Sequence, residues 1–229
     1  MGDNGGNYKG IMSKEKEYNE SITVTVLDRQ ERLDPNALRL LTYGKPEDVC
    51  KIDGRNFPSG RLGNMSGGYH FNLFDMKWYS SEHLYLCGEW SLNTDKCIEA
   101  QRYVLKMKSG AWAWRFSKAK YKNDIRTDFP SFRHQWMLWC VWQKCRLNEK
   151  YAELLKSVPD DVIIVERVKK NDLVWSTNLD ENGILYGGNA MGKILTICRR
   201  HLIAGTTPAI DTDLLNASNI HILGTKIQF

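Results

Sequence analysis

One segment constrains the fold more than any other: the stretch from about Ser131 to Arg146 is apolar on nearly every face when it is placed on a helix. Its large apolar side chains are Trp136, Met137, Leu138, Trp139, Val141 and Trp142. A helix without a polar face must be surrounded by protein. We therefore predict a central, buried helix around which the rest of the chain packs.

Helix signals also occur on both sides of this segment. Thr94 is a good N-cap residue, and Gly205 follows a helical pattern at the position where helices commonly end. The predicted helices are Ser81 to about Trp90, Thr94 to Met107, Asn148 to Val158 and Asn189 to Ala204.

Strand signals are fewer. Alternating or continuous runs of β-branched and aromatic residues predict strands at Ser21–Leu27 and Val162–Val168, a strand or hairpin at Tyr69–Tyr79, and a weak strand at Ile220–Phe229. A short apolar element covers Leu38–Tyr43, and the glycine-rich stretch Asp53–Gly68 and the polar stretch Lys169–Gly188 are predicted loops.

These elements predict one α+β domain over residues 21–229, dominated by helices and containing a small sheet. Residues 1 to about 20 are rich in Gly, Asn, Lys and Glu, so we expect this segment to be a disordered tail.

Composition narrows the class of protein. The chain has 229 residues and a modest formal net charge of +5, and no apolar run approaches the length of a membrane span. The first residues lack the apolar core of a signal peptide, so we expect a cytoplasmic protein that does not contact the membrane. The six cysteines form no C-x-x-C pair, which favours buried free thiols over disulfides or a zinc site.

Glu82 is the first candidate site residue. Ser80 and Ser81 favour the start of a helix, which puts Glu82 in its first turn, where unpaired N–H groups and the helix dipole stabilise a carboxylate. Glu82 is therefore either a helix-end residue or a catalytic carboxylate, and this segment alone does not separate the two.

The segment from Lys106 to Lys122 mixes basic and aromatic residues. Such a mixture suits a polyanion with exposed bases. The alternative is a helix whose aromatic side chains face the core while its lysines are solvated.

The sequence Gly187 to Lys193 fits the first part of a nucleotide-binding phosphate loop, but we reject that interpretation. Ile194 stands where the motif needs Ser or Thr, and too few residues follow to build a nucleotide-binding sheet. A weaker expectation survives, in which the N–H groups of a glycine-rich turn entering a helix bind a phosphate.

Other chemistry has weaker support. His83 and Cys87 are one helical turn apart, but no second ligand pair stands at metal spacing, so we expect no metal and no cofactor. Asp172 follows a predicted buried strand and could act as an acid or base, with Trp175 either beside a ligand or capping the core.

Several separated motifs, taken together, resemble the NADAR superfamily, also called YbiA-like. The motifs are Gly63-Asn64-Met65, Trp78-x-Ser80-Ser81-Glu82-His83, Arg126-x-Asp128-Phe129, Glu166 with Asn171-Asp172-x-x-Trp175, and Gly188-Asn189-x-x-Gly192. The resemblance spans about residues 40–204 and implies a compact, helix-rich α+β fold. Members of this family hydrolyse N-glycosidic bonds, either in early riboflavin-pathway intermediates or between ADP-ribose and guanine.

The resemblance implies catalytic roles for Glu82 and Asp172. It implies substrate-binding roles for Asn64, Arg126, Asp128, Phe129, Trp175, Gly188, Asn189 and Gly192. The chain departs from the family pattern at five positions: Leu86 replaces a Gln, Phe129 a Trp, Ser176 a Gly, Gly63 a Ser and Met65 a Phe.

The expected function is therefore N-glycosidase activity that removes ADP-ribose from a guanine base in nucleic acid. Two alternatives stay open: an N-glycosidase of riboflavin-pathway intermediates, and a module that binds ADP-ribose or a related ligand without turnover.

Overall fold

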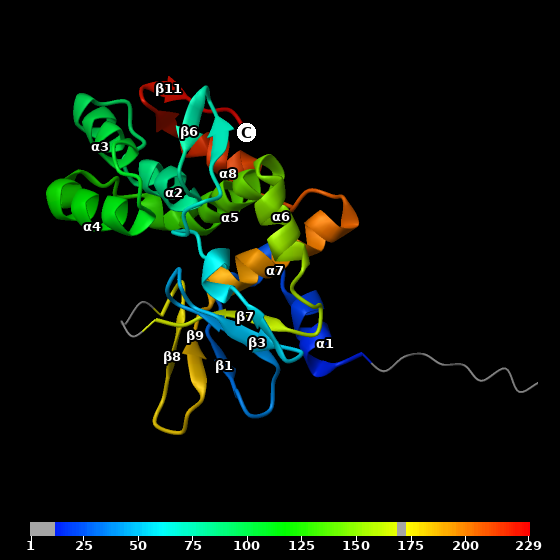
Figure 1. Ribbon diagram of the computed structural model, residues 1–229. Helices are drawn as coiled ribbons and strands as arrows, with labels where there is room; N and C mark the ends of the chain where they lie inside the picture. The colour runs from blue at the N-terminus through cyan, green and yellow to red at the C-terminus, as the bar shows by residue number, and fades with distance from the viewer. Residues whose placement is uncertain (1–11, 169–172) are drawn as a thin grey trace, which may run out of the picture.

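The computed structural model describes residues 12–168 and 173–229 (Figure 1). The α-helices are α1 (Lys14–Ser21), α2 (Ser81–Glu89), α3 (Asp95–Leu105), α4 (Gly110–Tyr121), α5 (Phe129–Leu147), α6 (Glu149–Lys156), α7 (Ala190–Ala204) and α8 (Thr212–Ala217). The strands are β1 (Glu31–Leu33), β2 (Leu40–Tyr43), β3 (Cys50–Ile52), β4 (Arg55–Phe57), β5 (Phe71–Leu73), β6 (Met76–Trp78), β7 (Ile163–Glu166), β8 (Thr177–Leu179), β9 (Leu185–Gly187), β10 (His221–Ile222) and β11 (Thr225–Lys226). Short 3-10 helices lie at η1 (Val24–Val26), η2 (Ser59–Leu62) and η3 (Lys122–Asp124).

Helix α5 is the centre of the helical part, as predicted from its all-round apolar sequence. It packs against α2, α6, α7 and α8, and Trp136, Leu138 and Val141 are fully buried. Gly88 allows α2 to lie close to α5, because a Cβ atom at this position would stand 2.1 Å from the indole nitrogen of Trp136. That nitrogen donates a hydrogen bond to the Tyr85 carbonyl oxygen (3.0 Å), which fixes α2 against α5.

Strands β1, β3, β7, β8 and β9 gather on the opposite side of α7 from α2 and α3, whereas β6 and β11 lie beside α2, α3 and α8 (Figure 1). β2 and β7 pair in parallel, with Leu40 opposite Ile163, and the antiparallel sheet has the order β1-β9-β8. The remaining strands form two-stranded antiparallel units. The predicted mixed α+β architecture with small sheets is confirmed.

Helix α7 lies on β7 with little space between the two backbones. A Cβ atom at Gly192 would stand 2.1 Å from the carbonyl oxygen of Ile164, so only glycine fits here without a shift. The predicted helix end at Gly205 is confirmed, because Gly205 has φ of 65° at the C-cap.

Two predictions for the N-terminal part are wrong. Val24–Val26 is a 3-10 helix and not part of a strand, and α1 forms within the predicted disordered tail. The Asn19 side chain of α1 is buried and donates to the carbonyl oxygens of Asp160 (2.8 Å) and Val162 (3.0 Å). These contacts are long-range, which explains why a local reading of composition missed them. Residues 1–11 lie outside the described residues.

Both predicted loops contain regular structure. Asp53–Gly68 includes β4 and η2, and the stretch before Gly188 includes β8 and β9. The other element predictions hold, since Tyr69–Tyr79 forms the β5-β6 hairpin and Ile220–Phe229 contains the β10-β11 hairpin. None of the helices in the described parts of the chain is both long and apolar enough to cross a bilayer.

Candidate active site

The β5-β6 hairpin leads directly into α2 and places Glu82 in the first turn of that helix, as predicted. The Glu82 side chain is only 2% exposed. The amide nitrogen of Asn64 donates a hydrogen bond to its carboxylate, and the Glu82 backbone N–H donates to the Asn64 carbonyl oxygen (3.2 Å). Asn64 is itself buried, so the structure brings together two predicted site residues that are far apart in sequence.

The loop that carries Asn64 is held from beneath by α5 and α6. The Lys144 ammonium group donates to the Gly63 carbonyl oxygen (3.3 Å) and lies 3.7 Å from the centre of the Tyr151 ring. The Tyr151 hydroxyl donates to the Leu62 carbonyl oxygen (2.6 Å). Burial lowers the pKa of Lys144 to about 7, so this fully buried amine loses its charge easily.

Aromatic rings form a wall beside Glu82. Tyr85, one turn further along α2, meets the edge of Trp175 at 5.5 Å between ring centres and the ring of Phe129 at 5.4 Å. The centres of the His134 and Trp175 rings lie 5.0 Å apart. Trp175 is half-buried, whereas Phe129 is 5% exposed. The structure therefore brings Phe129 and Trp175 together through their shared contact with Tyr85.

The Tyr85 hydroxyl is the polar group of this wall. Burial raises its pKa well above the ordinary value, and the negative charges of Glu89 and Glu82 raise it further. The phenol therefore keeps its proton at neutral pH and can donate it in a hydrogen bond. Among the described residues it has no hydrogen-bond partner, which leaves it available to a ligand.

Backbone hydrogen bonds to α7 hold the segment that carries Trp175. The N–H groups of Gly188, Asn189, Ala190 and Met191 donate to the carbonyl oxygens of Leu173 (2.6 Å), Ser176 (3.4 Å), Val174 (3.3 Å) and Trp175 (3.1 Å), respectively. The expectation that this helix start leaves its N–H groups open for a phosphate is wrong at these positions, because the chain uses them internally.

Asn189 also has a structural role. Its φ is 47°, its side-chain oxygen accepts from the Glu166 N–H (3.0 Å), and its side-chain nitrogen donates to the Ile164 carbonyl oxygen (3.0 Å). With Gly192 packed on the same strand, Asn189 fixes α7 to β7 and thereby fixes the segment that carries Trp175.

Arg126 is buried and fully engaged in the protein. It forms a two-pronged pair with Asp128 (2.7 Å for both bonds), and it donates to the Ser91 hydroxyl (2.9 Å) and the Ser218 carbonyl oxygen (2.6 Å). Its guanidinium group also lies 4.8 Å from the centre of the Phe132 ring. Arg126 thus ties the end of α2 to the start of α5 and to the C-terminal segment. Its partner Asp128 is exposed, and the hydrogen bond from Arg126 lowers the pKa of Asp128.

Asp172 lies outside the described residues. The structure adds two buried residues of α2 that the sequence analysis did not single out, Tyr85 and Glu89. Glu89 is buried and pairs with Lys118 (2.6 Å), and burial raises its pKa while Lys118 partly opposes that shift. Glu82, Tyr85 and Glu89 are spaced i, i+3 and i+7, which places them on the same face of a helix. This spacing is the sequence pattern from which Tyr85 and Glu89 could have been identified.

His83, adjacent to Glu82, has a structural role. Its Nε2 donates to the Met107 carbonyl oxygen (2.9 Å), so Nδ1 accepts the hydrogen bond from the Ser80 hydroxyl (2.8 Å). Burial lowers its pKa to about 4. Within residues 12–168 and 173–229, no group of three or more His, Cys, Asp or Glu side chains is placed to hold a metal ion.

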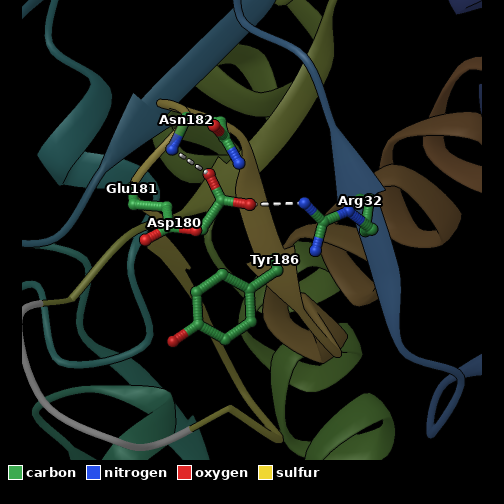
Figure 2. Close-up of a pocket in the computed structure, with 5 residues that line it drawn as sticks. All are labelled: Arg32, Asp180, Glu181, Asn182 and Tyr186. Carbon is green, nitrogen blue, oxygen red and sulfur yellow. Dashed lines mark hydrogen bonds and ion pairs between the residues drawn. The ribbon is translucent and has the colours of Figure 1, made fainter.

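Two surface hollows lie elsewhere. The hollow in Figure 2, about 380 Å³, is lined by Arg32, Asp180, Glu181, Asn182 and Tyr186. Arg32 pairs with Asp180, whose carboxylate also accepts the Asn182 N–H (2.9 Å), so these two opposite charges neutralise each other.

A second hollow of about 600 Å³ opens where β2 and β7 end, and Lys45, Asp48 and Arg167 are its charged lining residues. The carboxyl ends of parallel strands are a common place for ligands, and the two cations there suit an anion. One wall of this hollow reaches η2, because the Gly60 N–H donates to the Asp48 carbonyl oxygen (2.9 Å).

Lys193, the last residue of the motif that resembles a phosphate loop, is fully buried. Its ammonium group donates to the carbonyl oxygens of Val26 (3.1 Å) and Arg29 (2.7 Å) and pairs with Glu31 (3.1 Å). These contacts agree with the rejection of a nucleotide-binding phosphate loop.

Comparison with known proteins gives a likeness in structure. No protein family and no curated protein sequence matches the chain. Among solved structures, the NMR structure of the E. coli protein YbiA is similar to this chain, with a TM-score of 0.53 and 19% sequence identity, over 73% of this chain and 86% of YbiA. The chain has a YbiA-like fold.

Proposed function

We propose that the protein is an N-glycosidase that hydrolyses a ribosyl N-glycosidic bond, with ADP-ribose attached to guanine in nucleic acid as its substrate. The observation that carries this proposal is the buried Glu82 carboxylate, oriented by Asn64 and bordered by the Tyr85 and Trp175 rings. The YbiA-like fold and the resemblance in sequence motifs support the same reaction class.

The proposed chemistry needs carboxylates and water. Water adds to the anomeric carbon, the bond from that carbon to the base nitrogen breaks, and the base leaves with a proton. The transition state resembles an oxocarbenium ion, which a carboxylate can stabilise while it also accepts the proton of the attacking water. We assign this role to Glu82 and assign proton transfer to the leaving base to Asp172, with the Tyr85 phenol as a hydrogen-bond donor.

We assign recognition of the base to the aromatic wall. Trp175 is half-buried at the edge of the site, and we assign it stacking on a purine or a flavin precursor. Phe129 supports Tyr85 from within. Arg126, Gly188 and Asn189 make their hydrogen bonds inside the protein, and Gly192 packs against the Ile164 carbonyl oxygen. We therefore propose that these four residues position the site and do not hold the phosphates.

One observation favours the alternative of a ligand-binding module without turnover. Leu86, one turn after Glu82, is fully buried and supplies no polar atom where the family has a Gln. The riboflavin-pathway alternative uses the same carboxylates and differs only in the base that Trp175 contacts. We further propose that the protein acts in the cytoplasm, since all six cysteines are free thiols and five of them are buried.

The test is incubation of the purified protein with an oligonucleotide that carries ADP-ribosylated guanine and, separately, with early riboflavin-pathway intermediates. Mass spectrometry should show free ADP-ribose and unmodified guanine in the first reaction. Cleavage of the riboflavin intermediates alone would replace the substrate, and tight binding of ADP-ribose without any cleavage would replace the enzyme with a binding module.

A further inference from the structure

Helix α4 presents an outer face that the candidate active site does not use. The segment from Lys106 to Lys122 contains no acidic residue and carries six Lys or Arg side chains. The expectation that its aromatic residues face the core is wrong for Trp112, which is 61% exposed, and for Trp114, which is 39% exposed.

One stripe of the helix combines exposed residues with the partly exposed Phe116. Trp112, Arg115, Phe116 and Ala119 stand at i, i+3, i+4 and i+7, with Lys122 one turn further on. The rings of Trp112 and Phe116 contact each other with their centres 5.2 Å apart, so the stripe holds a continuous aromatic surface. We call these five residues the α4 stripe.

The positive charges of the stripe itself are unpaired. Its neighbours Lys118 and Lys120 pair with Glu89 and Glu99. In contrast, Lys108, Arg115 and Lys122 form no ion pair with any residue that the structure describes. Cations without internal partners are available to an external anion.

Helix α4, which carries the stripe, begins close to Glu82. A Cβ atom at Gly110, the first residue of α4, would stand 3.0 Å from the Met65 backbone and 3.0 Å from the Ser80 hydroxyl. Met65 follows Asn64, and Ser80 precedes α2, so α4 begins beside the candidate active site. The Lys118 to Glu89 pair then holds α4 along α2 (Figure 1).

We propose that the α4 stripe binds single-stranded nucleic acid, with a base stacked on Trp112 and backbone phosphates contacted by Arg115 and Lys122. Exposed aromatic rings between unpaired cations are the combination that single strands need, because every base offers a flat face and every linkage a negative charge. Two rings on a strongly basic face give less apolar area than a helix that inserts into a membrane surface requires. This inference rests on the proposed function in one respect, since it names the surface that would hold the strand next to the modified base.

The test measures binding of an unmodified, fluorescein-labelled oligothymidylate of about 12 nucleotides by fluorescence anisotropy at several salt concentrations. Trp112→Ala should raise Kd about tenfold, in line with the loss of one stacked base. The double variant Arg115→Gln with Lys122→Gln should also weaken binding and lower the slope of log K against log salt by about 1.4, that is ~0.7 per lost phosphate contact. The matched control is Arg55→Gln with Lys150→Gln, which removes one exposed Arg and one exposed Lys from β4 and α6 and should bind as the wild type does.

The outcomes separate the inference from the proposed function. Turnover of free ADP-ribosylated guanosine should be the same in the wild type and in the α4 variants, because the small substrate does not reach the stripe. Oligonucleotide binding that is unchanged in both variants overturns the inference. The inference is also overturned if the protein binds a duplex of the same length as tightly as the single strand and Trp112→Ala does not weaken that binding. It is overturned as well if the protein binds vesicles of phosphatidylserine and phosphatidylcholine through Trp112 and does not bind the oligonucleotide. Absence of turnover with intact, Trp112-dependent strand binding defeats only the proposed function.

Discussion

Asn64 and Glu82 hold each other through two hydrogen bonds, one from the Asn64 side chain to the Glu82 carboxylate and one from the Glu82 backbone N–H to the Asn64 carbonyl oxygen (3.2 Å). The carboxylate therefore has a fixed direction although it stands on the first turn of a helix. A residue that served only helix-end electrostatics would not need a buried side-chain partner from a loop 18 positions earlier.

Glu82→Gln should retain the fold and lose at least about a hundredfold in kcat, because the amide cannot accept the proton of a water or carry negative charge. The measurements are the rate on whichever substrate proves active and the melting temperature. The matched control is Glu149→Gln, which changes an exposed carboxylate in the first turn of α6 and should leave the rate unchanged. A Glu82→Gln variant with a wild-type rate would return Glu82 to a helix-end role.

Trp175→Ala should weaken ADP-ribosylguanosine binding by ~1–3 kcal/mol, and Trp175→Phe by much less, because a phenyl ring keeps most of the stacking face. Calorimetric titration of the Glu82→Gln background avoids turnover during the measurement. Trp112→Ala is the control for loss of a tryptophan far from the wall. If both Trp175 variants unfold and neither shows a separate binding defect, Trp175 is a core residue.

Chelation should not affect catalysis. The proposed reaction uses carboxylates and water, and the described residues contain no cluster of three or more His, Cys, Asp or Glu at metal spacing. Activity after EDTA treatment and desalting should equal that of untreated enzyme. Loss of activity that zinc or magnesium restores would refute the mechanism.

Acid should destabilise the fold through His83. Burial lowers the His83 pKa to about 4, below the ordinary value of 6.5, so the folded state favours the neutral ring. This contribution is fully present above pH 6.5 and is lost as the pH falls toward 4, by at most about 3 kcal/mol. Urea denaturation at pH 7 and pH 4.5 measures it, and His83→Gln should flatten the difference while His221→Gln should not.

Gly192→Ala should destabilise the protein by ~1–3 kcal/mol, since the new methyl group would meet the Ile164 carbonyl oxygen, a backbone atom that cannot rotate away. Thermal unfolding measures the effect. Gly67→Ala is the control, because a Cβ atom there has no neighbour within 4 Å. Equal stability of the two variants would show that α7 can move away from β7 at little cost.

Sequence patterns within a few residues correctly predicted the elements that depend on local side-chain chemistry. The apolar run of α5, the Thr94 N-cap of α3 and the Gly205 end of α7 follow from side-chain chemistry within a few residues, and the structure confirms all three. The segment Val24–Val26 was predicted as a strand because its apolar residues alternate, but Lys193 donates to the Val26 carbonyl oxygen (3.1 Å) from the distant helix α7. Only the folded chain supplies that contact.

The residues of the candidate site also divide into those that a local pattern predicts and those that only long-range contacts define. Glu82 could be found because a carboxylate beside good N-cap residues is a recognisable local pattern. Tyr85 could be found only through helix spacing, and the use of the α7 N–H groups by residues 173–176 could not be found at all, because it depends on where two loops meet. The roles of Asp172 and of the aromatic wall in binding remain predictions.

The hydrogen bonds that fasten residues 173–176 to the start of α7 all involve backbone atoms. The fastening therefore does not depend on which side chain stands at position 175. Under the proposed function, exchanging the indole for another aromatic group changes the surface that meets the base while the anchoring peptide groups stay the same. Related proteins or designed variants can then acquire a different preferred base at little cost to folding.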